Sequence, residues 1–301
     1  MARAFGKIIL AGEHSVVYGY PAIACPIPLI VDIDIRFSNN PGLYFHNKTF
    51  IPKDGSKLLF TRIFLKLVEL LGRNVGFLEI NVFNSIPNGY GLGSSAALSI
   101  SLIRSIIIFL NTPRTSNDIA SIAMEIEKIF HGNPSGIDHT TILEEKFIWF
   151  KNGNFEKINT QLEIEIVIVM SKSYGMTIKS IDHVSRLSNT QTKYTNNILE
   201  SIANLTNQMR KAIELCNYLD IGYLMNENHR LLRALGVSNL ELDYLCNVAI
   251  SNGALGAKLT GAGGGGCIII FAIKNTMKKL NKIFKNYGYN TFLLKYLSGI
   301  L

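Results

Sequence analysis

The segment that most constrains this chain is rich in glycine and covers residues 87–97, with the sequence PNGYGLGSSAA. Its alternating glycines permit a tight bend and let the backbone approach a ligand closely, because no side chain stands in the way. An apolar run with helical character begins at Ala96. Amides at the start of such a helix, with the positive end of its dipole, favour an anion, most often phosphate. Nucleotide binding is therefore the first hypothesis.

The spacing of this segment excludes the better-known phosphate loops. No lysine follows the last glycine, as it does in G-x-x-x-x-G-K-[ST], and Gly89, Gly91 and Gly93 form G-x-G-x-G instead of the dinucleotide-binding G-x-G-x-x-G. Protein-kinase signatures such as H-R-D and D-F-G are absent from the sequence. The two serines that follow, Ser94 and Ser95, offer hydroxyls to phosphate or to magnesium. The alternative is a strand-to-helix turn that needs glycine for its geometry alone.

Composition favours a globular protein, because 48% of the 301 residues are hydrophobic and this length allows two cores of ordinary size. The apolar tract 96–110 is interrupted by serines and Arg104, so it is too short to span a membrane and indicates a buried helix. The first residues lack the pattern of a signal peptide. Four scattered cysteines fit buried thiols in a reducing cytoplasm. The net charge of +8 suits an anionic ligand, whereas the scattered basic residues argue against nucleic acid.

Hydrophobic periodicity predicts mixed strands and helices in the first half and mostly helices in the second. Strands are expected over residues 4–11, 23–37, 75–86, 146–150 and 163–170, and helices over 57–71, 95–111 and 116–130. Residues 177–252 are expected to be largely helical, followed by a strand at 267–273, a helix at 275–286 and a strand at 291–296. The polar segment 152–161 is the expected boundary between domains 1–155 and 156–301. The pattern predicts an α+β fold in two lobes.

A second informative segment covers residues 127–138, with the sequence EKIFHGNPSGID. Its two carboxylates, Glu127 and Asp138, bracket a turn built from glycine and proline, which holds the backbone firmly. Metal-assisted phosphoryl transfer needs one carboxylate to complete a magnesium shell and another to orient or deprotonate the attacking hydroxyl. The alternative is an ordinary helix end followed by a turn.

Two further segments carry unusual residues. Near the N-terminus, Lys7 lies at the edge of an apolar strand, where its ammonium needs a partner, and Glu13 and His14 interrupt apolar sequence. A lone histidine without other context is more often a satisfied core or surface residue. Residues 258–267 (KLTGAGGGGC) hold a glycine run beside apolar segments, which favours close approach to another loop or a ligand over a flexible linker.

Residues 12–19 (GEHSVVYG), 87–97, 131–138 (HGNPSGID) and 258–267, in this order, resemble the GHMP family of small-molecule kinases. The resemblance extends over residues 6–267. It implies a two-lobed fold, with an N-terminal lobe like ribosomal protein S5 and a ferredoxin-like C-terminal lobe. It also implies that residues 258–267 pack against the phosphate loop.

The resemblance assigns roles to individual residues. Asp138 is expected to be the catalytic base or orienting carboxylate, with Lys7 beside it to lower its pKa and to stabilise transition-state charge. Glu13 and His14 are expected to line the acceptor pocket, and Thr177 is a candidate for substrate contact. Magnesium is expected at Ser95 and Glu127. The residues expected to wrap the ATP phosphates are Gly89, Tyr90, Gly91, Leu92, Gly93, Ser94 and Ser95.

The reaction that the resemblance implies is ATP-dependent phosphorylation of the primary 5-hydroxyl of mevalonate, in isoprenoid synthesis. Phosphomevalonate, a sugar and homoserine are the alternative acceptors. An alternative of another class is a ligand sensor that kept the fold and lost catalysis; the presence of Lys7, Ser95, Glu127 and Asp138 argues against it. A cytoplasmic enzyme is expected, and a homodimer is common among its relatives.

Overall fold

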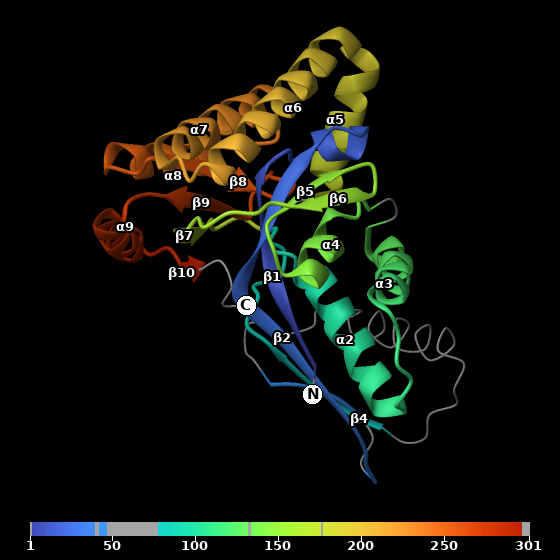
Figure 1. The fold of residues 1–301 in the computed structure, drawn as a ribbon. Helices are drawn as coiled ribbons and strands as arrows, with labels where there is room; N and C mark the ends of the chain where they lie inside the picture. The colour runs from blue at the N-terminus through green and yellow to red at the C-terminus, as the bar shows by residue number, and fades with distance from the viewer. Residues whose placement is uncertain (1, 40–41, 47–77, 132–133, 176, 297–301) are drawn as a thin grey trace. The chain divides into compact units, whose positions relative to one another are not determined.

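The computed structural model describes residues 2–39, 42–46, 78–131, 134–175 and 177–296. Its contacts divide the chain into two compact units, and each unit is assembled from separate stretches of sequence (Figure 1). Unit 1 contains Met1–Gly6, Leu29–Asn88 and Gly93–Glu144. Unit 2 contains Lys7–Pro28, Gly89–Leu92 and Glu145–Leu301. Within the glycine-rich segment, residues 89–92 therefore belong to unit 2, and residues 87–88 and 93–97 belong to unit 1.

The described residues of unit 1 combine part of a sheet with the helices α2 (Ser94–Leu110), α3 (Ser116–His131) and α4 (Ile137–Glu144). The second half of β2 (Ala22–Phe37) pairs antiparallel with β4 (Leu78–Asn84), and β4 pairs in parallel with β3 (Gly42–Phe45). The helices α2, α3 and α4 all contact one another. They place the end of the glycine loop and the second acidic segment in one unit.

Helix α2 is buried along most of its length, as its apolar run predicted. Its buried serines do not leave unsatisfied hydroxyls. Ser101 Oγ donates to the Ala2 carbonyl at 2.8 Å, and Ser105 Oγ donates to the Ile33 carbonyl at 2.7 Å. These bonds join the helix to the strands and explain why hydroxyls are tolerated in a buried helix.

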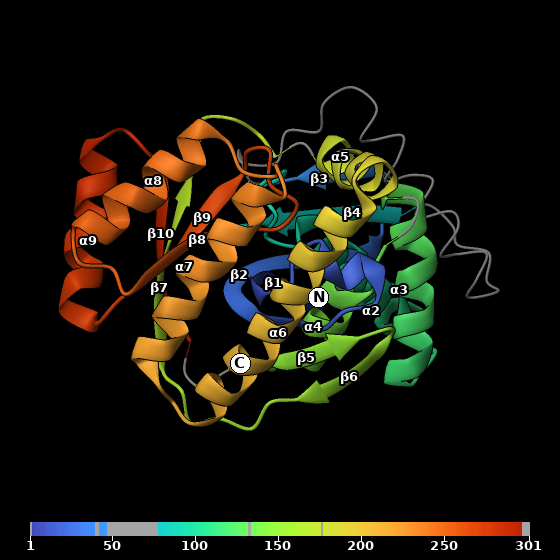
Figure 2. The ribbon, with the colours of Figure 1, turned by 90° about the horizontal axis from the view of Figure 1, so that it is seen from above.

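Unit 2 contains a four-stranded antiparallel sheet in the order β10-β7-β9-β8 (Figure 2). Its strands are β7 (Ile164–Met170), β8 (Gly256–Thr260), β9 (Cys267–Phe271) and β10 (Thr291–Tyr296). Its helices are α5 (Thr177–Thr190), α6 (Thr192–Glu214), α7 (Tyr218–Ala234), α8 (Leu240–Ser251) and α9 (Lys274–Asn286). Helices α7 and α8 contact β8, while α9 contacts β7 and β10. This βαββαβ arrangement confirms the ferredoxin-like fold expected for the C-terminal half.

The remaining described elements of unit 2 are strands outside this sheet and one short helix. Strand β1 (Ala2–Ala11) pairs with β2 and begins in unit 1. The short helix η1 (Ser15–Tyr18) follows it. Strand β5 (Ile148–Lys151) pairs with the first residues of β2 and with β6 (Asn154–Lys157).

Five described elements were not expected from the sequence: η1, β3, β6, β8 and α4. Every residue of β6 is exposed, so this hairpin strand shows no apolar pattern. Strand β8 is buried on both faces but is only five residues long, too short for periodicity to identify. The helix expected at 57–71 lies outside the described residues. No helix in the described ranges is long and apolar enough to cross a membrane.

Candidate functional site

The glycine-rich loop adopts the backbone conformation for which glycine is suited. Gly89, Gly91 and Gly93 all have φ between +76° and +78°. Other residues pay a steric cost in this left-handed region. Helix α2 begins directly after Gly93, and its first turn carries no acidic side chain. The loop therefore ends at a helix N-terminus whose amides and dipole favour an anion.

The unit 2 part of this loop lies against the glycine run at 258–267. A Cβ atom added to Gly91 would lie 2.7 Å from the Thr260 carbonyl oxygen. The Cys267 thiol lies 3.0 Å from the Tyr90 carbonyl oxygen. These contacts confirm the expectation that the second glycine run packs against the first.

Lys7 is buried and holds the loop from the side of β1. Its side chain is 2% exposed, its Nζ donates to the Gly91 carbonyl at 3.2 Å, and its amide donates to the Leu92 carbonyl at 2.9 Å. The edge lysine of the apolar strand thus has the partner that its burial requires. Its charge lies beside the backbone of the phosphate loop.

In unit 1, the helices α2, α3 and α4 carry the predicted serines and carboxylates. The Ser94 hydroxyl hydrogen-bonds the side chain of Asn88, and Ser95 lies in the first turn of α2. Glu127 on α3 is 3% exposed. Asp138 lies in the first turn of α4, not on the turn that the sequence suggested, because the helix already begins at Ile137.

The oxygen donors of unit 1 are of the kind that magnesium prefers, namely the hydroxyl of Ser95 and the carboxylate of Glu127. In the described ranges, no group of three or more His, Cys, Asp or Glu side chains could hold a metal. Magnesium is usually bound through one or two carboxylates, with substrate phosphates and water completing its shell. The donor set therefore fits a magnesium ion that arrives with a nucleotide.

The segment after β1 contains a strained turn. His14 has φ +62° and ψ −46°, and the Ser15 amide donates to the Glu13 carbonyl at 2.7 Å. This is the γ-turn with positive φ, which is rare and strained. Holding a non-glycine residue in such a conformation costs on the order of 1–3 kcal/mol, and such strain gathers at functional sites.

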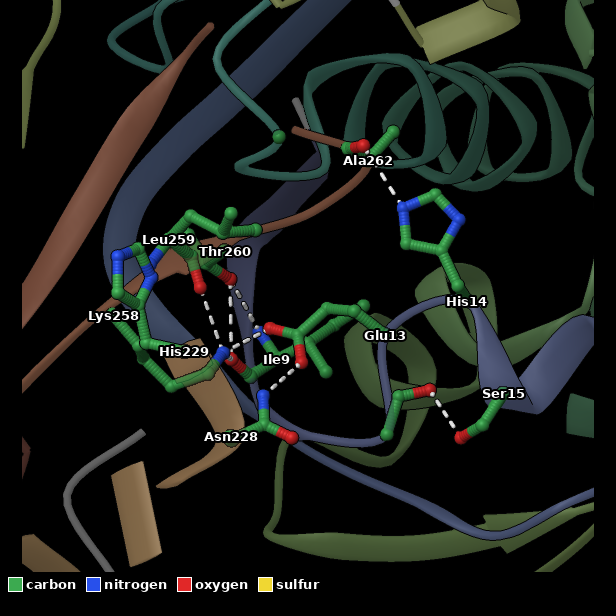
Figure 3. Close-up of polar contacts among 12 residues, drawn as sticks. Ile9, Glu13, His14, Ser15, Asn228, His229, Lys258, Leu259, Thr260 and Ala262 are labelled. Atoms are coloured by element: carbon green, nitrogen blue, oxygen red, sulfur yellow. Dashed lines mark hydrogen bonds and ion pairs between the residues drawn. The ribbon is translucent and has the colours of Figure 1, made fainter. Parts of the chain in front are cut away.

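Glu13 points into the interior of unit 2 (Figure 3). It is 1% exposed, forms an ion pair with Lys258, and accepts from Asn228 Nδ2 at 2.9 Å. Lys258 is fully buried, and its Nζ also donates to the Leu259 carbonyl at 2.7 Å and to the Ile9 carbonyl at 3.3 Å. Burial lowers the pKa of Lys258, and the Glu13 carboxylate opposes this shift.

His14 makes a different contact from Glu13 (Figure 3). Its Nε2 lies 2.9 Å from the Ala262 carbonyl oxygen, so Nε2 donates and Nδ1 is left as an acceptor. Burial lowers the pKa of His14 to about 4, although the Ala262 carbonyl partly opposes the shift. His14 is therefore neutral at physiological pH. Its hydrogen bond to Ala262 joins the strained turn to the glycine run at 258–267.

The lowered pKa of His14 predicts a pH-dependent contribution to stability. The unfolded chain binds a proton near pH 6.5 and the folded chain only near pH 4, so the free energy of unfolding falls as pH decreases through this window. The slope from one such group approaches about 1.4 kcal/mol per pH unit. We expect His14→Gln, which keeps a side-chain donor, to flatten the wild-type slope by this amount in urea unfolding between pH 6.5 and 4.5. Parallel slopes for the two proteins would contradict the assignment.

The sequence reasoning did not identify Asn228, and it named Lys258 only as the start of the glycine run. Asn228 belongs to the buried face of α7, between Met225 and Leu232. A polar residue within an apolar helical stripe is the signal that could have found it. Thr177 is the first residue of α5.

Comparisons with known proteins agree with the fold. The family model described as GHMP kinases N terminal domain matches residues 59–145, and GHMP kinases C terminal matches residues 209–288. Mevalonate kinase of Pyrococcus abyssi is 36% identical over 297 residues, which cover 90% of this chain and 88% of that protein.

Two solved structures are similar along nearly the whole chain. The crystal structure of L. major mevalonate kinase in complex with R-mevalonate has a TM-score of 0.86 and 25% identity, covering 98% of this chain and 95% of that one. The crystal structure of Methanococcus jannaschii mevalonate kinase has a TM-score of 0.84 and 28% identity, covering 98% and 97%.

Proposed function

Because this chain belongs to the GHMP kinase family, we propose that it transfers the γ-phosphoryl group of ATP to the 5-hydroxyl of mevalonate. The products are 5-phosphomevalonate and ADP, which places the reaction in isoprenoid synthesis. The observation that carries the choice of acceptor is the similarity to mevalonate kinases over about nine-tenths of the chain. The glycine-rich loop that ends at the N-terminus of α2 supports phosphoryl transfer, because its amides and the helix dipole favour a phosphate group.

In unit 1, Asp138 accepts the proton of the 5-hydroxyl as the hydroxyl oxygen bonds to the γ-phosphorus. The bond from that phosphorus to the β,γ-bridging oxygen breaks, and ADP leaves with its electron pair. Ser95 and Glu127 would hold magnesium, which would neutralise part of the phosphate charge when bound. Most of the rate comes from positioning and electrostatic stabilisation, because phosphoryl transfer demands little covalent chemistry from the protein.

In unit 2, the residues of the glycine-rich loop and of the segment after β1 bind the two substrates, ATP and the acceptor. Backbone amides from Gly89 onward bind the phosphates, and Lys7 stabilises the charge that develops in the transition state. Glu13, His14 and Thr177 belong to the acceptor side. With Nε2 donating to Ala262, neutral His14 accepts a hydrogen bond at Nδ1 from a hydroxyl of the acceptor.

The test is ADP release with Mg-ATP against mevalonate, phosphomevalonate, galactose and homoserine. Turnover on mevalonate alone supports the proposal. Turnover on another acceptor would keep the phosphoryl-transfer roles and overturn the acceptor. ATP binding without turnover on any of the four would contradict the proposed reaction. The homodimer expected from the resemblance stays a prediction, and light scattering on the purified protein checks it.

Glu127→Gln is expected to raise the free Mg²⁺ needed for half-maximal ADP release by at least about 10–100-fold, the loss typical of disturbing a metal's supporting groups. The amide keeps the shape of the side chain and removes its charge. Glu125→Gln is the matched control, because Glu125 lies on the same helix but is exposed and paired with Lys128 at 2.6 Å. An unchanged Mg²⁺ requirement in Glu127→Gln would remove this residue from the metal site.

A further inference from the structure

The strained turn at His14 is held by a buried polar network that lies entirely within unit 2. Its members are Glu13, Asn228 and Lys258, which are between 0% and 1% exposed. They come from three separate parts of the chain: the loop after β1, helix α7 and strand β8. Glu13 joins the network through its side chain and the strained turn through its carbonyl.

Lys258 has no capacity left for a ligand. Its ammonium carries three protons, and three acceptors face it: the Glu13 carboxylate, the Leu259 carbonyl and the Ile9 carbonyl. A lysine in a glycine-rich segment of a kinase could be expected to bind phosphate. All three N–H donors of Lys258, however, already have acceptors within the protein. Its charge serves to hold Glu13.

Asn228 serves the same carboxylate. Its Nδ2 donates to Glu13, while its Oδ1 has no hydrogen-bond partner within the described ranges. An apolar side chain would avoid a buried, unsatisfied oxygen, so stability alone does not explain an amide at this position. The donor that it supplies to Glu13 does explain it.

Neighbouring contacts fix α7 and β8 to each other at this level. The Leu259 amide donates to His229 Nδ1 at 3.3 Å, and His229 Nε2 lies 3.1 Å from Asp243. Thr260 Oγ1 accepts from the Ile9 amide at 3.0 Å and lies 3.1 Å from the Ile9 carbonyl. Asn228 and Lys258 therefore lie next to residues that hydrogen-bond α7 to β8 and β8 to β1, whereas the strained residue is His14 in the turn beside Glu13.

From this geometry we infer that Lys258 and Asn228 are positioning residues for the acceptor: they clamp the Glu13 side chain and thereby hold His14 in its strained conformation, from which it binds the acceptor. Glu13 on this view acts through the turn and not by direct contact with the acceptor. The inference rests on the proposed function for the identity of the acceptor, and on the structure alone for the clamp.

The experiment uses two changes that break the clamp and one that does not. Asn228→Leu removes the uncharged donor. Glu13→Gln with Lys258→Met removes both charges together, so that neither is left buried alone. Asn226→Leu is the matched control, because Asn226 also links α7 to β8, through Leu255 and Ala257 at 3.0 and 2.9 Å, without touching Glu13.

We expect both clamp variants to lower kcat/KM for mevalonate by about 10–100-fold, the effect of a small misplacement at a reacting group, with the KM for ATP unchanged. In the same ligand-free proteins, hydrogen exchange at the Ser15 amide is expected to speed up. Asn226→Leu is expected to change thermal stability but neither of these readouts.

Clamp variants that behave like Asn226→Leu in both measurements would overturn the inference and leave Lys258 and Asn228 with a structural role only. The exchange measurement needs no acceptor. If the wild-type protein does not turn over mevalonate, the proposed function fails, while faster Ser15 exchange in the clamp variants still supports the clamp. Unchanged exchange refutes it whatever the acceptor.

Discussion

Asp138→Asn is expected to lower kcat by at least about 10²–10³-fold, the loss seen when one preorganised catalytic group is removed. The amide has nearly the same shape but does not accept a proton from the attacking hydroxyl. Asp138 is only half-buried in the first turn of α4, so the change removes little packing. Thermal unfolding should therefore be close to that of the wild type, and the loss should appear in single-turnover ADP formation.

Asp118→Asn is a suitable control for this substitution. Asp118 also lies in the first turn of a helix of unit 1, and it accepts hydrogen bonds from the Thr115 amide and hydroxyl at 3.0 and 2.9 Å. Asparagine preserves an acceptor there, so turnover should stay at the wild-type level. Near-normal turnover of folded Asp138→Asn would remove Asp138 from the mechanism.

Gly91→Ala is expected to lower kcat/KM for ATP by at least about 10²-fold, because a shift of about 1 Å in a positioned group has an effect of this size. The new Cβ would lie 2.7 Å from the Thr260 carbonyl oxygen, which is backbone of strand β8 and cannot rotate away. The loop must then move, and with it the amides proposed to bind phosphate and the carbonyl that accepts from Lys7.

Gly153→Ala separates this steric effect from backbone strain. Gly91 and Gly153 both have φ +76°, but nothing lies within 4 Å of a Cβ at Gly153. Both variants carry the roughly 1–2 kcal/mol cost of a left-handed alanine, while only Gly91→Ala displaces the loop. The affinity for ATP, measured by calorimetry, should fall in Gly91→Ala alone. Equal affinities in the two variants would show that the contact with Thr260 does not shape the loop.

Much of the fold was predictable, because its signals are local. The run of glycines followed by an apolar stretch predicted the loop and α2, whose observed range begins one residue before the expected Ser95. The strand at 291–296 and the helix near 275–286 were also predicted from periodicity. Elements without a periodic pattern were missed: β6 is wholly exposed and β8 wholly buried, so neither alternates.

In the candidate site, too, some features have a local sequence signal and others depend on distant parts of the chain. The residue types and their spacing determined that the loop at 89–95 suits phosphate, and that serine and carboxylate oxygens accompany it. They did not show where Glu13 points, since its partners Asn228 and Lys258 are more than two hundred residues away along the chain.

By itself, the sequence therefore predicted a loop suited to phosphate, the helix behind it and the closing strand, helix and strand of the second half, because each depends on backbone preferences and periodicity within a short segment. Only the tertiary structure decided that Glu13 is buried on Lys258, that Asn228 completes this clamp, and that His14 is held in a strained turn. Burying a charge is favourable only where a distant partner compensates it, and the folded chain alone supplies that partner.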